Sequence, residues 1–341
     1  MRLGLSAVRT TVNFGTWGSG APANVEVVQL AERLGYDSVW TAEASGTDAV
    51  TPLAWLAAHT TTIKLGTAVM QMTARPPTTT AMTAATLDLL SGGRFILGLG
   101  VSGPVVVEGW HGAAFASPLE RTREYLKVVR DALSRQPVEH HGRHYRYPYD
   151  GDDASGLAAP VRLMFRPRRP SVPIYIAAMG PKNVALAYEL ADGVMPAFYS
   201  PYREDAFFSF TDSPLPRSIE VAPFVPVAIG ENHQACRDRL KPSFAFWFGG
   251  MGAKGLNFYN RFISRLGFEH EASVIQELYT KGLRAQAAAA VPDALVDELS
   301  LCGPRARIAE QLAAWEESAV TTMILTGADV EAITTVAELA L

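Results

Sequence analysis

Short apolar runs rich in β-branched residues alternate along this chain with longer segments in which apolar residues recur every three or four positions. The short runs have the length and composition of buried strands, and the longer segments have the periodicity of amphipathic helices. This pattern predicts strands at residues 3–8, 37–41, 63–70, 95–101, 174–178, 193–198, 220–229 and 321–325.

Helices are expected between these strands, at residues 24–34, 52–60, 78–90 and 119–133, and again after Pro181. Gly35 and the pair Gly92-Gly93 end two of them, as glycine often does. No helix is expected between the fourth strand and Pro118, so residues 102–117 are predicted to form a long loop. Eight strands alternating with helices indicate an α/β fold of the (β/α)8 TIM-barrel type, with a doubly wound sheet as the alternative.

The length of 341 residues and the hydrophobic content of 48% suit one barrel of this kind. Two segments, 136–172 and 244–291, interrupt the alternation, and neither is long enough to enclose a core of its own. We therefore expect a single domain over residues 1–341, with both segments as insertions at the C-terminal face of the barrel.

Charge and cysteine content narrow the class of protein further. The formal net charge of -4 gives no sign of a nucleic-acid or membrane surface, and no apolar run approaches the roughly 18 residues of a membrane span. Cys236 and Cys302 lie far apart without a CxxC spacing, which predicts reduced thiols. We expect a soluble, cytoplasmic protein whose partner is a small molecule, not a nucleic acid or a membrane.

Two patterns resemble ligand motifs but lack the required context. Residues 98–103 match GxGxxG, yet Gly98 and Gly100 fall inside a predicted strand instead of the turn that a dinucleotide site needs. His140, His141 and His144 lie between two prolines without helical periodicity or an HExxH spacing, so a solvated loop is expected there and not a metal site.

The turn after the fifth strand is a candidate phosphate site. Ala178, Met179 and Gly180 follow a β-branched run, and Pro181 suits the first turn of the next helix because it lacks an N–H. Small residues before a helix leave free N–H groups and the positive end of the helix dipole, which favour an anion. An ordinary β–α turn is the alternative.

In a barrel, the active site is built at the C-terminal ends of the strands. Here those ends carry small, apolar and aromatic residues with few ionisable groups, and they lack paired carboxylates or a Schiff-base lysine. Such a mouth suits a flat cofactor that brings its own chemistry. Its polar and titratable positions include Glu43, Ser102, Glu108 and His111.

Four motifs carry a family resemblance that covers essentially the whole chain. They read TAEASGTDAVTPLAW (41–55), SGGRFILGLGVSGPVVVEGWHG (91–112), GPKNVALAYELADG (180–193) and GGMGAKGLNFYNR (249–261). The chain resembles the bacterial luciferase-like superfamily and, within it, an actinobacterial group of coenzyme F420-dependent oxidoreductases. The resemblance implies a TIM barrel that binds F420 in its mouth, with the deazaflavin ring against the ends of the third and fourth strands.

The resemblance also implies positions for the cofactor. The superfamily carries a non-prolyl cis peptide bond at the end of the third strand, which matches Ala68-Val69, and a phosphate site that matches Met179-Gly180-Pro181. The implied cofactor-binding residues are Glu43, Ala68, Val69, Met70, Ser102, Gly103, Ala178, Met179, Gly180, Pro181 and Asn183.

The chain departs from the F420-dependent sugar-phosphate dehydrogenases. Where that subfamily carries an Asp-His pair, this sequence reads Glu43-Ala44; Pro104 replaces an acidic residue, and Val107 replaces an asparagine. Oxidation of a sugar phosphate is therefore not expected. Instead we expect an F420H2-dependent reductase of an electron-poor C=C, C=N or C=O bond, with an FMN-dependent monooxygenase or a non-catalytic binding protein as alternatives.

The sequence also offers candidates for proton delivery and for the kind of substrate. His111 and Glu108, in the predicted loop after the fourth strand, are the candidate catalytic residues, and a water molecule is the alternative donor. A homodimer is expected. An apolar or aromatic substrate is suggested by Trp17, Trp110, Phe198, Tyr199, Trp247 and Phe248, with packing in the core or over the cofactor as the alternative role of these rings. Attraction of the anionic cofactor is suggested by Arg162, Arg166, Arg168 and Arg169, with a solvated charged surface as the alternative.

Overall fold

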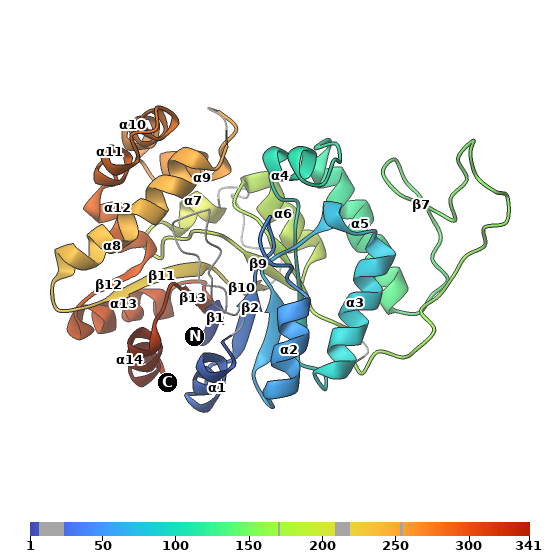
Figure 1. The fold of residues 1–341 in the computed structure, drawn as a ribbon, viewed down its shortest axis with the longest axis horizontal. Coiled ribbons are helices and arrows are strands. Elements are labelled where there is room, and N and C mark those ends of the chain that lie inside the picture. Colours follow the sequence, from blue (N-terminus) through green and yellow to red (C-terminus); the bar gives the residue numbers. More distant parts are fainter. Residues whose placement is uncertain (7–23, 170, 209–218, 253–254) are drawn as a thin grey trace.

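The computed structural model describes residues 1–6, 24–169, 171–208, 219–252 and 255–341. Within them one parallel sheet runs in the order β10-β9-β8-β5-β3-β2-β1-β13-β11-β12, and β4 also pairs with β5 (Figure 1). The strands are β1 (Arg2–Ser6), β2 (Ser38–Thr41), β3 (Lys64–Thr67), β4 (Met70–Gln71), β5 (Phe95–Gly100), β8 (Ile174–Ala177), β9 (Gly193–Met195), β10 (Glu220–Val221), β11 (Phe224–Ile229), β12 (Leu301–Gly303) and β13 (Thr322–Thr326).

The stretch formed by β10 and β11 closes the sheet into a barrel. On one side Ala222 N donates to Val194 O of β9 at 2.9 Å. On the other side Ile324 N donates to Pro223 O at 2.9 Å, from β13. Because one stretch bonds to both neighbours, the (β/α)8 barrel predicted from the sequence is confirmed and the doubly wound alternative is excluded.

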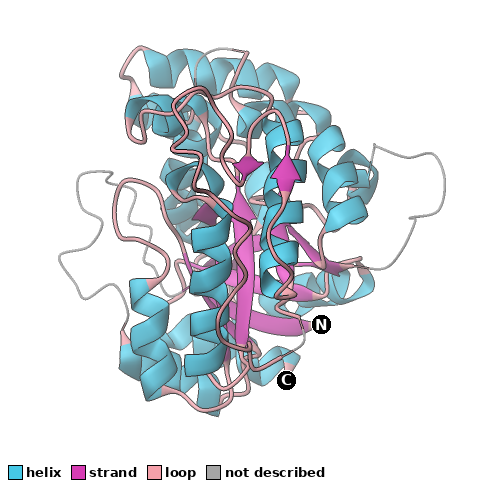
Figure 2. Ribbon diagram, turned by 90° about the vertical axis from the view of Figure 1, so that its right-hand side faces the viewer, coloured by secondary structure: helices cyan, strands magenta, loops and turns pink. Residues whose placement is uncertain are grey.

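Helices surround the sheet (Figure 2), and along the chain they alternate with its strands as expected. Those that follow barrel strands are α1 (Val25–Arg33), α2 (Thr51–His59), α3 (Pro77–Leu90), α5 (Pro118–Leu133), α6 (Pro181–Leu190), α7 (Glu204–Phe208), α8 (His233–Ala245), α13 (Arg305–Glu317) and α14 (Val330–Ala340). Their buried faces form the main apolar cluster with the outer faces of the strands.

The two interruptions of the repeat lie on opposite sides of the barrel (Figure 1). A π-helical turn (Phe246–Gly250) and helices α9 (Phe258–Arg265), α10 (Glu269–Thr280), α11 (Arg284–Ala289) and α12 (Asp293–Leu299) pack with α8 into a second apolar cluster. On the other side, a projecting arm follows α5 and includes the short hairpin β6 (His140–His141) and β7 (Arg146–Tyr147). The three histidines of this segment lie in and beside the hairpin, where Glu124 and Glu120 contact His140 and His144 at 3.3 Å.

One prediction of local structure was wrong. Residues 102–117 do not form a continuous loop, because helix α4 (Pro104–Gly109) begins directly after β5. Proline at the first helical position is compatible with helix initiation, and Val107 is fully buried, so tertiary packing overrides the poor helix propensity of the three valines. The fourth strand and this helix still do not form a dinucleotide motif, since Gly98 and Gly100 lie inside β5.

Close contacts with the neighbouring strand segment explain these two glycines. A Cβ atom on Gly98 would lie 1.8 Å from the carbonyl oxygen of Thr67, and one on Gly100 would lie 2.5 Å from Val69 Cγ2. The interior below them is filled by a small cluster in which the Trp40 and Tyr175 rings lie 5.7 Å apart. The barrel centre is therefore a packed core in the described part of the chain.

Candidate functional site

The peptide bond between Ala68 and Val69 is cis, as the resemblance implies. It divides the predicted third strand into β3 and β4, both of which pair with β5. Both side chains are half-buried and pack on the cluster inside the barrel. Met70 differs from them, because it is fully buried in the main core; its contact with a cofactor stays a prediction.

Glu43 lies just beyond β2 and is committed to contacts within the protein. Its two carboxylate oxygens accept from Arg75 Nη1 and Nη2 at 2.6 and 2.8 Å, and from the backbone N–H groups of Ala49 at 3.1 Å and Gln71 at 3.3 Å. Its side chain is only 6% exposed. Burial raises the pKa of Glu43, but the hydrogen bonds from Arg75 and the two N–H groups outweigh it and hold the pKa below the usual range. Direct contact between Glu43 and a cofactor stays a prediction; what its contacts support is a brace between the ends of β2 and β4.

Gln71 connects this ion pair to His111. Its amide nitrogen donates to the carbonyl oxygens of Glu43 at 3.1 Å and Ala44 at 3.5 Å, and its amide oxygen lies 2.9 Å from His111 Nε2. Gln71 is 1% exposed and His111 is half-buried. The contact spans 40 residues of sequence, so the sequence placed Gln71 at a strand end without indicating its partner.

The other candidates near the fourth strand are more open. Glu108 is exposed, and its carboxylate accepts from Phe115 N at 3.2 Å, which braces the loop after α4. Ser102 has a positive φ of 60°, and a Cβ atom on Gly103 would meet no described atom within 4 Å. The rim at Ser102-Gly103 therefore leaves room for a ligand to approach the backbone closely.

The turn after β8 has the form expected of an anion site. Ala178 and Met179 are buried, Gly180 precedes α6, and Pro181 is its first residue. Asn183 donates from Nδ2 to Ala177 O at 3.1 Å, while its Oδ1 is buried without a hydrogen-bond partner among the described residues. A Cβ atom on Gly180 would meet no described atom within 4 Å, so none of the described residues fills the space directly over this glycine.

Arg265 of α9 reaches this turn, which the sequence did not predict. Its Nη2 donates to Met179 O at 2.7 Å, and its Nε is buried with no hydrogen-bond partner in the described part of the chain. Burial, with a smaller effect from Arg261, lowers the pKa of Arg265. It also lines a cavity of about 460 Å³ with Arg203 and Asp205. The contact joins segments 86 residues apart, so no local pattern could reveal it.

The aromatic residues suggested for a substrate pocket differ in their burial. Phe198, Tyr199 and Phe248 are buried in the core, so they do not line an open pocket. Trp110 is 65% exposed, Trp247 is half-buried, and Trp17 lies outside the described residues.

The arginine-rich stretch is also badly placed for the phosphate turn. Arg169 forms an ion pair with the buried Asp88, and Arg168 and Arg169 lie nearest to Gly93, which precedes β5. That is the N-terminal end of the strand, whereas the turn follows the C-terminal end of the parallel strand β8. The expectation that these two arginines attract the cofactor was therefore wrong. Arg162 and Arg166 are exposed on the arm.

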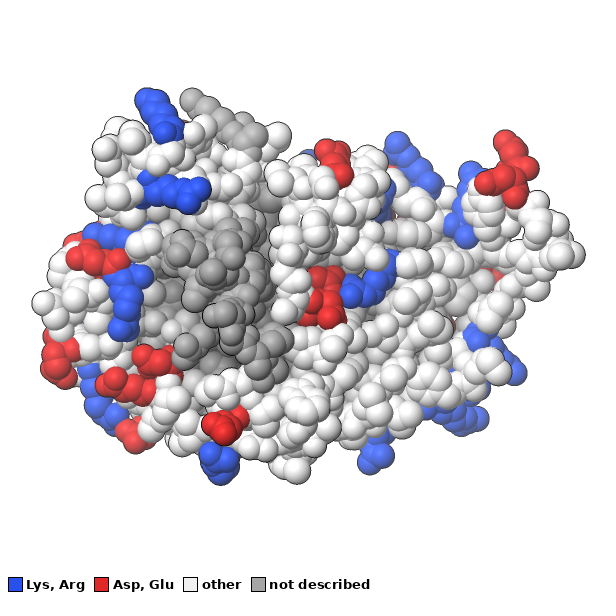
Figure 3. All heavy atoms as spheres, viewed as in Figure 1, with Lys and Arg blue, Asp and Glu red and all other residues white. Residues whose placement is uncertain are grey.

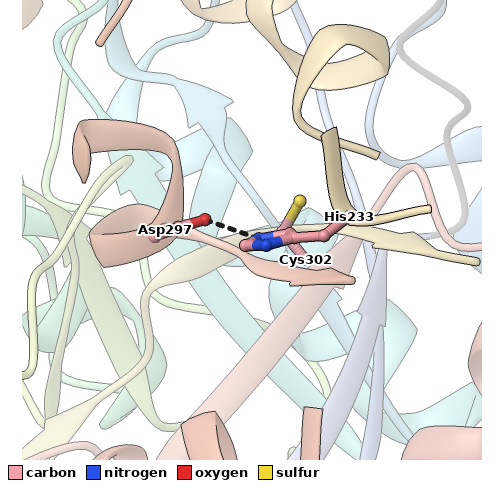
Figure 4. A group of neighbouring side chains, drawn as sticks. All are labelled: His233, Asp297 and Cys302. Carbon is pink, nitrogen blue, oxygen red and sulfur yellow. Dashed lines mark hydrogen bonds and ion pairs between the residues drawn. The ribbon is translucent and has the colours of Figure 1, made fainter. Parts of the chain in front are cut away.

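His233, Asp297 and Cys302, whose side chains are of metal-ligand types, form a cluster on the side of the barrel away from the arm (Figure 1 and Figure 4). His233 Nε2 lies 3.0 Å from Asp297 Oδ1. Asp297 also accepts from Arg237, at 3.0 Å from its Nε, and from Arg307 at 2.9 Å. Burial raises the pKa of the Cys302 thiol to about 12, so it is protonated at neutral pH. Because two guanidinium groups already bind Asp297 and the thiol is protonated, the cluster favours a structural role over metal binding. It joins α8, α12, β12 and α13.

Comparison with known proteins shows the family. The family model for luciferase-like monooxygenases matches residues 1–322, and the chain belongs to this family. It is 42% identical, over 99% of both chains, to a Mycobacterium tuberculosis protein whose name assigns it to the coenzyme F420-dependent oxidoreductases. It is 27% identical to 5,10-methylenetetrahydromethanopterin reductase of Archaeoglobus fulgidus, over 87% of each chain.

A solved structure supports the fold. The coenzyme F420-dependent tetrahydromethanopterin reductase of Methanopyrus kandleri superposes with a TM-score of 0.77 at 21% identity, covering 99% of this chain and 97% of that one. The family resemblance read from the sequence is thus confirmed. None of the helices in the described ranges is both long enough and apolar enough to cross a membrane.

Proposed function

We propose that this protein is a coenzyme F420-dependent oxidoreductase that uses the reduced cofactor to reduce a C=C, C=N or C=O bond of a small molecule. The assignment of F420 as the cofactor rests on the 42% identity, over 99% of the chain, to a relative named for F420. The more distant reductases of similar length agree with it. The direction of the reaction and the bond reduced rest on the chemistry of the mouth.

The residues at the mouth fit such a cofactor. The half-buried Ala68 and Val69 present small side chains at the end of β3, and Ser102-Gly103 leaves open backbone beside them. At the turn before α6, Gly180 leaves space for a phosphate. The Nε of Arg265 has no hydrogen-bond partner among the described residues and is available to donate to this group. These two groups of residues would hold the ring and the phosphate respectively.

When bound, the reduced deazaflavin supplies a hydride. Reduction of a polarised double bond then needs a proton at the product, or a hydrogen bond that holds its negative charge. His111 is the titratable side chain best placed for this, because it is half-buried at the rim and oriented by Gln71. Glu108 is exposed and bonded to its own loop, which makes it a weaker candidate.

The experiment that tests this function is a fluorescence titration of the purified protein with F420 and, in parallel, with FMN. We expect saturable binding of F420 and weaker or no binding of FMN. Turnover is then followed as reoxidation of F420H2 with a panel of conjugated ketones, enones and imines under anaerobic conditions. Tight binding of FMN alone, with oxygen-dependent turnover, would instead support the monooxygenase that the family model's name describes.

We also propose that the protein is a homodimer that associates through α2 and α3. Large apolar side chains on these helices are exposed, among them Trp55 at 56% and Leu90 at 62%, with Met82 and Leu89 close to half exposed. Figure 3 shows an almost uncharged surface over these two helices. An apolar patch of this kind is typical of a covered interface. Light scattering should give twice the chain mass, and Trp55→Glu with Leu90→Glu should give the monomer mass; a monomeric wild type would refute this.

A further inference from the structure

The side chain of Gln71 is held in one orientation by its neighbours. Its Nε2 donates to two backbone carbonyls, those of Glu43 and Ala44, at 3.1 and 3.5 Å. Turning the amide by half a rotation would place its oxygen against two carbonyl oxygens, and neither could donate to it. The buried amide therefore presents its oxygen, and not its nitrogen, to His111 at 2.9 Å.

A carbonyl oxygen can only accept a hydrogen bond, so the nitrogen that faces it must carry a proton. This nitrogen is His111 Nε2. In the neutral imidazole only one nitrogen is protonated, which leaves Nδ1 with a free lone pair. The fixed amide of Gln71 thus selects one of the two tautomers of His111.

Resting on the function proposed above, we propose that Gln71 is a positioning residue that holds the proton of His111 on Nε2 and so leaves Nδ1 as the atom that exchanges a proton with the substrate. In the reduction, the imidazolium form releases its Nδ1 proton to the anionic product centre and becomes neutral imidazole. The Nε2 proton stays on His111, hydrogen-bonded to the Gln71 oxygen, and solvent returns a proton to Nδ1 for the next turnover.

The charged groups behind Gln71 keep this arrangement neutral. Glu43 and Arg75 form a two-bond ion pair whose charges cancel, and Glu43 also binds the Gln71 N–H at 3.3 Å. Glu108, three residues before His111, is exposed and bonded to Phe115 N. The side chain that directly meets His111 Nε2 is therefore an uncharged acceptor, which orients the ring.

The test is the protonation state of His111 in the protein without cofactor. Selective ¹⁵N-histidine labelling and long-range ¹H–¹⁵N correlation spectra distinguish the tautomers, and His111→Gln assigns the signal among the seven histidines. We expect the Nε2–H tautomer at a pH above the pKa of His111. A wild-type spectrum with the proton on Nδ1 would overturn the proposal, whether or not the protein binds F420.

Two substitutions at Gln71 give different predictions. Gln71→Met removes the acceptor, so His111 should become a mixture of tautomers and the pH profile of kcat should change. Gln71→Glu places a negative charge at Nε2, which favours the imidazolium, so the pH profile of kcat should move to higher pH. A folded Gln71→Met with the wild-type tautomer and profile would contradict the proposal.

The chain offers a matched control for the loss of a buried amide. Gln311 is 5% exposed, donates to the carbonyls of Asp297 and Ser300 at 3.1 and 3.2 Å, and accepts from Cys302 N. Gln311→Met removes the same groups far from the mouth. It should lower stability as Gln71→Met does, with an unchanged His111 signal. If instead both variants disturb His111 equally, its tautomer reports general loosening of the fold, and the proposal fails.

Discussion

Removing the charge of Glu43 should destabilise the fold more than it weakens cofactor binding. In Glu43→Gln the side chain keeps its size, but Arg75 loses a carboxylate that it contacts through both terminal nitrogens. The two side chains are only 6% and 21% exposed, so water replaces the lost interaction poorly. Leaving one partner of a buried ion pair uncompensated typically costs about 3–5 kcal/mol, and we expect a loss of about 3 kcal/mol in the free energy of unfolding.

An exposed ion pair of the same geometry provides the control. Arg123 also contacts Glu189 through both terminal nitrogens, but these side chains are 51% and 53% exposed. Glu189→Gln should therefore cost less than about 1 kcal/mol. Urea unfolding, followed by tryptophan fluorescence and circular dichroism, measures both changes. Equal midpoints for the two variants would refute the argument that burial makes the Glu43 pair strong.

The effect of Glu43 should also depend on pH with a definite sign. Its pKa in the folded protein is lowered, so the charged form stabilises the fold fully above the ordinary value of 4.5. This stabilisation is lost as the pH falls through the lower, folded pKa. The difference in unfolding free energy between wild type and Glu43→Gln should then be constant near neutral pH and shrink in acid. If Glu43 contacts the cofactor directly, F420 affinity in Glu43→Gln will fall at neutral pH even in the fully folded protein.

Three further substitutions test the mouth. Gly180→Val should weaken F420 binding about tenfold or more without changing the urea midpoint, because φ is -82° and no described atom lies within 4 Å of the added Cβ; unchanged affinity would remove the phosphate assignment. His111→Gln should lower kcat and abolish its dependence on one ionisation while F420 affinity stays the same; a retained pH profile would favour solvent as the proton donor. Arg265→Met should weaken F420 binding and reduce its dependence on salt; binding with the wild-type salt dependence would show that Arg265 does not meet the anion.

The sequence revealed the barrel because its strands and helices are local patterns. Apolar periodicity located the eight barrel strands, and the motif at Ala68-Val69 correctly implied a cis peptide bond. The limits of the strands were less exact: the predicted strand at 220–229 is divided at Ala222-Pro223, since proline has no N–H for the ladder. Helix α4 was missed because three consecutive valines favour strands when they are considered without their packing partners.

The side-chain network at the mouth could not be read in the same way. Candidate residues at strand ends were recognised individually, but their partners are fixed by the tertiary structure. Gln71 meets His111 across 40 residues, Arg75 meets Glu43 across 32, and Arg265 meets Met179 across 86. The aromatic residues show the converse problem: Phe198 and Phe248 have the chemistry of a substrate pocket, but in the structure they fill the core between barrel and insertion.

These long-range contacts divide the mouth into two parts with different physical tasks. At the turn before α6, backbone N–H groups and the desolvated guanidinium of Arg265 provide positive potential. Among the described residues, no carboxylate forms an ion pair with Arg265. At the ends of β2 and β4, the charges of Glu43 and Arg75 cancel, and a neutral amide faces His111. An anion is thus favoured at one end of the mouth, while at the other end an uncharged amide oxygen orients His111. In the function proposed above, this separation places the anionic part of the cofactor and the proton donor at different ends of the mouth.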